Sequence, residues 1–83
     1  MDIAEKIREH LKGISKGIDI TTISDDDSLW QEGIIDSLGM LEFMAFVESE
    51  FRIKISNDDL VPENFDSVRN ISRYVESKIT LGL

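Results

Sequence analysis

Hydrophobic residues near the N-terminus recur at steps of four, four and three: Ile3, Ile7, Leu11 and Ile14. This spacing places them on one face of a helix, which we predict over residues 2–16, with Asp2 as its cap. Residues 17–36 are predicted to form a long loop, because their many Asp, Ser and Thr side chains compete for backbone hydrogen bonds. Apolar side chains are expected to hold this loop on the helices: Ile20, Ile23, Leu29, Trp30, Ile34 and Ile35.

A second helix is predicted over residues 37–51, with Asp36 as its cap. This helix is apolar on more than one face. One set of residues steps by four and is expected to point into the core: Phe43, Val47 and Phe51. A second stripe consists of Leu38, Leu41 and Ala45, flanked by Glu42 and Glu48. A helix that is apolar nearly all round is either deeply buried or uses its second stripe to bind a partner.

The C-terminal third of the chain predicts two further helices. A short helix over residues 57–61 is followed by Pro62, which ends it or starts a new turn. A longer helix over residues 67–80 is capped by Asp66 or Ser67. Its predicted core residues are Val68, Ile71, Tyr74 or Val75, and Ile79. The predicted fold is therefore all-α, an antiparallel four-helix bundle with a short third helix and a long loop between the first two helices.

Length and composition narrow the function. The 83 residues suffice for a single domain, 1–83. A net charge of −8 disfavours nucleic-acid binding and favours partners with basic surfaces. The chain has no cysteine, which rules out disulfides and thiolate metal sites and fits a reducing cytosol. Because no signal peptide and no membrane-spanning apolar run is found, we expect a cytoplasmic monomer that does not insert into membranes.

The most informative residues are Asp36-Ser37-Leu38, at the boundary between the loop and the second helix. A serine on the first turn of a helix suits a phosphate diester, because free backbone N–H groups and the positive end of the helix dipole face the added charge. Taken alone, Asp36 and Ser37 also read as an ordinary helix cap. Asp36 would repel a phosphate, so we interpret it as a cap and a recognition element.

The wider sequence resembles the acyl and peptidyl carrier proteins from Leu29 to about Ile79. Beyond Asp36-Ser37-Leu38, the resemblance lies in Glu42, in Val47-Glu48-Ser49-Glu50-Phe51, in Ile53-x-Ile55-x-Asn57-Asp58-Asp59-Leu60 and in Phe65-x-Ser67-Val68-x-x-Ile71-x-x-Tyr74-Val75. The resemblance implies that Ser37 receives a 4′-phosphopantetheine arm from coenzyme A, and that cargo is held as a thioester on the thiol of this arm. The protein itself would then be non-catalytic.

The same resemblance implies two kinds of partner: a phosphopantetheinyl transferase, and acyl-transferring or synthase enzymes with basic docking surfaces. The residues expected to face them are Asp36, Leu38, Leu41, Glu42, Ala45 and Glu48. The Asp-Ser-Leu motif in a freestanding chain indicates an acyl carrier of fatty acid or related synthesis. Gly39, where such carriers have an acidic residue, and the run Gly33-Ile34-Ile35-Asp36 indicate instead a carrier of amino acids such as D-alanine, or of specialised metabolites.

Three other readings remain open. A serine hydrolase would need a base beside Ser37, but the only histidine, His10, is expected to face solvent on the first helix. Calcium binding would use Asp25, Asp26 and Asp27, which are adjacent rather than spaced as in an EF-hand. A cofactor-free interaction module would use the second stripe of the second helix.

Overall fold

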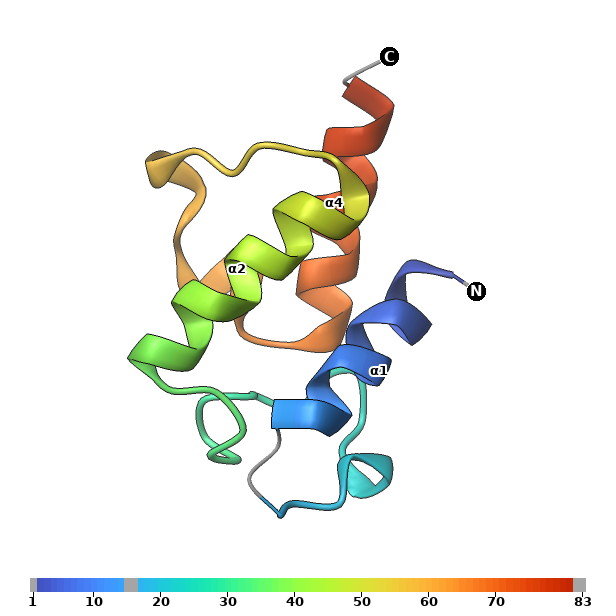
Figure 1. Ribbon diagram of the computed structural model, residues 1–83, viewed down its shortest axis with the longest axis vertical. Helices are drawn as coiled ribbons and strands as arrows, with labels where there is room; N and C mark the ends of the chain where they lie inside the picture. The colour runs from blue at the N-terminus through green and yellow to red at the C-terminus, as the bar shows by residue number, and fades with distance from the viewer. Residues whose placement is uncertain (1, 15–16, 82–83) are drawn as a thin grey trace.

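The computed structural model describes residues 2–14 and 17–81 of the chain (Figure 1). Within these ranges it contains four α-helices, two short 3-10 turns and no strand. The elements in order are α1 (Ile3–Ile14), η1 (Ile20–Thr22), α2 (Ser37–Phe51), η2 (Asn57–Asp59), α3 (Pro62–Phe65) and α4 (Val68–Leu81). The predicted all-α bundle is confirmed, and no helix in the described ranges is long and apolar enough to cross a bilayer.

Helix α1 begins as the sequence predicts. The backbone N–H of Glu5 donates to Asp2 Oδ1 over 2.8 Å, so Asp2 satisfies one of the free donors of the first turn. The helix ends at Ile14, and the predicted end at residue 16 lies outside the described residues. Gly17 has a φ of +86°, a left-handed conformation that favours glycine and turns the chain away from the helix.

Helix α4 contacts each of the other three α-helices and lies behind α2 in Figure 1. The core between them is apolar: Ile7, Leu11, Ile20, Ile23, Leu29, Ile34, Ile35, Met40, Phe43, Met44, Val47, Phe65, Val68, Ile71, Tyr74 and Val75 are buried. Phe51 is only partly buried against this core. Ile79, predicted as a core residue, is 38% exposed because it lies in the last turns of α4, beyond the packed helices.

Arg8, a residue of α1, makes several bonds to the loop over residues 17–36. Its Nη2 donates to the carbonyl oxygen of Ile23 over 2.6 Å, and its Nη1 donates to that of Ile20 over 3.2 Å. Arg8 Nη2 also pairs with Asp25 Oδ1 at 2.7 Å. The carbonyl oxygen of Ile20 also accepts from the N–H of Ile23 within a short turn, so Arg8 adds a second donor there and a side-chain donor at Ile23. The loop also contains η1, a short turn that was not predicted.

The acidic residues Asp25, Asp26 and Asp27 are bonded both within the loop and to the helices. Asp26 Oδ1 accepts from Arg69 Nε over 2.5 Å, and Asp27 Oδ2 accepts from the N–H of Ser24 over 2.9 Å. The described part of the chain contains no group of three or more His, Cys, Asp or Glu residues placed to hold a metal ion. The acidic run therefore joins the loop to α4. This structural role is the alternative to calcium binding by Asp25, Asp26 and Asp27.

Two predictions about the loop and the third helix were wrong in detail. Trp30 was expected to pack onto the helices, but its side chain is 42% exposed. The short helix predicted over residues 57–61 is only the 3-10 turn η2, and a separate helix, α3, begins after it at Pro62. Leu60 has φ −81° and ψ 67°, which are not helical angles, so the first turn ends there. Pro62 then begins α3, where its fixed φ suits the first helical position.

Helix α4 begins at Val68 and is capped by Ser67, whose Oγ accepts from the N–H of Asn70 over 3.1 Å. Asp66, the other predicted cap, lies against the long loop instead. Its carbonyl oxygen accepts from the N–H of Leu29 over 2.7 Å, and its Oδ1 accepts from the hydroxyl of Ser28 over 2.5 Å. Asp66 thereby joins the start of α4 to the segment that precedes α2.

The segment between α2 and α4 is held in place by the single tyrosine of the chain. The Tyr74 hydroxyl donates to Asp59 Oδ2 over 2.6 Å, and Lys78 Nζ lies 3.5 Å from the same oxygen. Burial raises the pKa of Tyr74 well above its usual value. The hydrogen bond to Asp59 and the negative charge of the Asp59 carboxylate raise it further. The fold therefore favours the neutral phenol.

We expect the melting temperature to fall above about pH 10, the pKa of an unfolded tyrosine. The contribution of Tyr74 is fully present below that pH and is lost as the pH rises toward the higher folded pKa. Melting curves by circular dichroism between pH 9 and 11.5 test this, with phenolate absorbance as the direct titration. Tyr74→Phe is the control, since it should show a shallower decline. A phenolate that appears with a midpoint near pH 10 while the protein stays folded would contradict the expectation.

Candidate functional site

Ser37 is the first residue of α2, as predicted, and Asp36 caps the helix. Asp36 has an extended backbone, and its Oδ1 accepts from the N–H of Gly39 over 2.7 Å. Its carbonyl oxygen accepts from the N–H of Met40 over 2.8 Å. The local sequence is sufficient for this geometry, because a short acidic side chain before an apolar helix reaches the free donors of the first turn.

Gly39 fits closely under this cap. A Cβ atom added at Gly39 would lie 3.1 Å from Asp36 Oδ1. A larger residue at this position would press on the oxygen that receives the Gly39 N–H. The glycine therefore lets the Asp36 carboxylate approach the N–H of residue 39 without crowding.

The residues around Ser37 fit a phosphate diester. Ser37 is exposed, so its hydroxyl is accessible to another protein. The first N–H groups of a helix have no partner within the helix and carry the positive end of its dipole. Asp36 already accepts from the N–H of Gly39 and its charge would repel a phosphate, so the attraction for a negatively charged group on Ser37 comes from the helix dipole and the other N–H groups of the first turn.

One face of α2 beside Ser37 is apolar and exposed. Leu38 is 67% exposed and Leu41 is 64% exposed, values that are high for leucine. Glu42 and Ala45 are also exposed and lie on the same face, since they follow Leu38 and Leu41 at steps of four. We call these four residues the α2 face: Leu38, Leu41, Glu42 and Ala45.

Glu48 was grouped with this face, but it makes contacts within the protein. Its Oε2 accepts from the N–H of Ile55 over 2.8 Å, and its carbonyl oxygen accepts from the N–H groups of Arg52 and Ile53. Arg52 has a φ of 55°, the left-handed conformation that ends α2. Glu48 therefore holds the chain where it leaves the helix.

His10 is partly buried, whereas it was predicted to face solvent. Its ring stacks on Phe46 with a centroid distance of 3.8 Å and an interplanar angle of 8°. Desolvation by this partial burial lowers the pKa of His10. Phe46 lies nine residues after Ser37, which corresponds to about 13 Å of helix rise. The histidine thus packs far along α2 from the serine, away from where a hydrolase would need its base.

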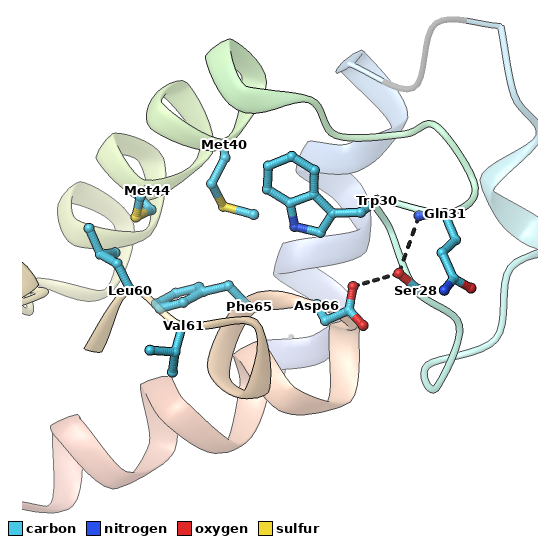
Figure 2. A pocket seen from close by; sticks show the side chains of 9 residues that line it. All are labelled: Ser28, Trp30, Gln31, Met40, Met44, Leu60, Val61, Phe65 and Asp66. Carbon is cyan, nitrogen blue, oxygen red and sulfur yellow. Dashed lines mark hydrogen bonds between the residues drawn. The ribbon is translucent and has the colours of Figure 1, made fainter. Parts of the chain in front are cut away.

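A cavity of about 440 Å³ opens between α2 and the segment that leads into α4 (Figure 2). It is lined by Ser28, Trp30, Gln31, Met40, Met44, Leu60, Val61, Phe65 and Asp66. In Figure 2 the apolar side chains of Met44, Leu60, Val61 and Phe65 gather at one end, and the polar ones of Ser28, Gln31 and Asp66 at the other. Met40 follows Ser37 by three residues, so the cavity begins about one helical turn from the serine.

No pattern in the sequence indicated that the residues of this cavity form a site. A partial signal was the pair Met40 and Met44, which steps by four from the first turn after Ser37. The other walls come from residues 28–31 and 60–66, and no local pattern indicates that these segments lie side by side. Phe65 also contacts the Tyr74 ring, with centroids 5.0 Å apart, so α3 is attached to α4.

Comparison with known proteins gives consistent matches. A family profile described as "Phosphopantetheine attachment site" matches residues 5–75. The chain is 35% identical over 48 residues to aminoacyl carrier protein 2 of Bradyrhizobium diazoefficiens, a match that spans 58% of this chain and 54% of that relative. It is 33% identical over 58 residues to the D-alanyl carrier protein of Streptococcus pyogenes serotype M5, spanning 70% of this chain and 72% of the relative.

A solved structure resembles the fold. It is a chain of the crystal structure of Bradyrhizobium japonicum glycine:[carrier protein] ligase complexed with glycylated carrier protein. The TM-score is 0.68 at 30% sequence identity, and the match covers 87% of this chain and 97% of that chain. Together with the profile match over most of the sequence, this shows that the chain belongs to the family of phosphopantetheine-binding carrier proteins.

Proposed function

We propose that Ser37 is the residue that carries the 4′-phosphopantetheine arm. The observation that carries this proposal is an exposed serine hydroxyl at the capped N-terminus of α2, within the Asp36-Ser37-Leu38 motif. The Ser37 oxygen becomes an ester oxygen of the phosphate, and Asp36 keeps the helix end ordered. When bound, the group supplies a thiol that holds cargo as a thioester. This chain, which lacks cysteine, supplies the attachment point and the docking surface and performs no chemistry itself.

We further propose that the cargo is an amino acid. The relatives named above are an aminoacyl carrier and a D-alanyl carrier, and the similar structure contains a glycylated carrier protein. The test is the intact mass of the protein purified from its own cell. We expect an aminoacyl increment on top of one phosphopantetheinyl unit, removed by hydroxylamine because it is a thioester. A long-chain acyl increment would contradict the aminoacyl assignment.

A carrier of fatty acid synthesis is the second candidate, and one observation favours it. The cavity beside α2 has an apolar end formed by Met44, Leu60, Val61 and Phe65, which could shield a hydrocarbon chain. The two candidate functions can be distinguished by incubating the holo protein with purified amino acid and fatty acid ligases and measuring which cargo is loaded. Loading with amino acids alone supports the first, and loading with fatty acids alone supports the second.

The α2 face is proposed as the docking surface for the transferase and the loading enzyme. Exposed leucines next to an attachment site provide apolar contact, and the Glu42 carboxylate attracts a basic rim. We expect Glu42→Lys to slow modification by the transferase about two- to fivefold at low salt, since exposed charge interactions contribute about 0.2–1 kcal/mol and act mainly on the association rate. Stopped-flow rates across a salt series provide the measurement.

The matched control is Glu76→Lys, an equal change of charge on an exposed position of α4. It should leave the rate nearly unchanged. Glu48 is unsuitable for charge reversal because it bonds the N–H of Ile55, so Glu48→Gln is the informative variant there. Equal rates for Glu42→Lys and the parent protein at low salt would show that Glu42 does not guide this partner.

A further inference from the structure

The polar end of the cavity contains a carboxylate without a cationic partner. Asp66 Oδ1 accepts from the Ser28 hydroxyl over 2.5 Å, and Ser28 Oγ accepts from the N–H of Gln31 over 3.2 Å (Figure 2). In the described part of the chain, Asp25, Asp26 and Asp59 pair with Arg or Lys side chains, whereas Asp66 does not. Its negative charge therefore borders the cavity and is balanced only by hydrogen bonds.

Trp30 lines the same cavity as this carboxylate. In Figure 2 its ring is drawn between Met40 and Asp66, and 42% of the residue is exposed. The face of an indole ring attracts an ammonium group, and a neighbouring carboxylate adds to this attraction. A partly exposed tryptophan and a carboxylate at one end of a small cavity form a site suited to a small organic cation.

We propose that Asp66 and Trp30 bind the α-ammonium group of an aminoacyl cargo, with the cavity residues toward Met44 and Leu60 facing its side chain. An aminoacyl thioester retains a protonated amine, whereas a fatty acyl thioester has no cation. The carboxylate thus favours the first cargo over the second. The assignment rests on the proposed aminoacyl function and on attachment at Ser37, from which the cavity begins one turn away.

The experiment compares two cargoes that differ only in the amino group. A phosphopantetheinyl transferase attaches alanyl- and propionyl-pantetheine to the whole protein from the corresponding coenzyme A analogues, with an amide in place of the thioester so that neither cargo hydrolyses. Nuclear magnetic resonance then follows the indole N–H of Trp30, the single tryptophan, and the backbone N–H of Asp66. We expect both signals to shift with the alanyl cargo and to remain near the unloaded positions with the propionyl cargo.

Asp66→Asn tests the carboxylate itself, since the amide oxygen can still accept from Ser28 and the backbone bond to Leu29 is unaffected. The variant should abolish the difference between the two cargoes. An ion pair on a partly exposed carboxylate favours the docked cargo by up to about fivefold, so a clear loss is expected. Asp58→Asn, at an exposed acid outside the cavity, is the matched control and should preserve the difference.

Equal shifts with alanyl and propionyl cargo would overturn the proposal, as would an unchanged difference in Asp66→Asn. The intact mass of each sample separates this failure from a failure of attachment at Ser37, and the mass of the protein purified from its own cell tests the aminoacyl cargo separately. If the mass rises by one loaded arm but the signals do not respond, only the ammonium site is wrong. If Ser37 takes up no arm at all, the proposed attachment at Ser37 is wrong, and the proposed ammonium site is then wrong as well.

Discussion

Replacing Ser37 with alanine is expected to abolish attachment of the phosphopantetheine arm completely. The parent protein, incubated with coenzyme A and a transferase, should gain the mass of one phosphopantetheinyl unit, and Ser37→Ala should gain none. The physical reason is that the hydroxyl oxygen is the atom that would form the new phosphate ester. Since Ser37 is exposed, its loss should leave the helical circular dichroism and the melting temperature almost unchanged.

Ser49→Ala is the matched control, because Ser49 is another exposed serine of α2 near its opposite end. This variant should still gain one unit. A mass gain that survives in Ser37→Ala would show that another residue carries the arm. The family assignment would stand in that case, since it rests on the sequence and fold comparisons.

The second large effect is expected on stability, from Leu29→Ala. Leu29 is fully buried although it lies in the long loop, and its N–H donates to the carbonyl oxygen of Asp66 over 2.7 Å. Its own carbonyl oxygen accepts from the N–H groups of Ile34 and Ile35. Truncating a buried leucine costs about 2–5 kcal/mol, a large share of the about 5–15 kcal/mol that stabilises a typical domain. Urea unfolding followed by circular dichroism measures the loss.

Leu41→Ala makes the same chemical change on the α2 face, where Leu41 is 64% exposed. It should alter the free energy of unfolding by no more than about 0.5 kcal/mol. The pair separates the two roles of leucine in this protein, since Leu41→Ala should instead weaken docking of the transferase at every salt concentration. Leu29→Ala with an unfolding free energy like that of the parent would mean that the loop contributes little to the core.

Local patterns in the sequence were enough for the helices and for the position of Ser37. The spacing of Ile7 and Leu11 predicted the buried side of α1, and Asp36 predicted the start of α2 at the correct residue. Both patterns involve residues within one or two helical turns of each other, so they can be recognised in the sequence without knowledge of the fold. The same reasoning failed at residues 57–61, where the angles of Leu60 are not helical and only the 3-10 turn η2 forms.

The tertiary structure alone decided how the loop, the α2 face and the cavity are built. Arg8 binds loop carbonyls, Glu48 bonds Ile55, and Ser28 donates to Asp66 across 38 positions of sequence. His10 packs on Phe46 for the same reason, as a residue of α1 meeting one of α2. Periodicity and capping depend on residues a few positions apart, whereas these contacts depend on which segments the hydrophobic core brings together. The sequence therefore determined where the attachment serine stands on its helix, and only the packing of α2 against distant segments determined the cavity beside it.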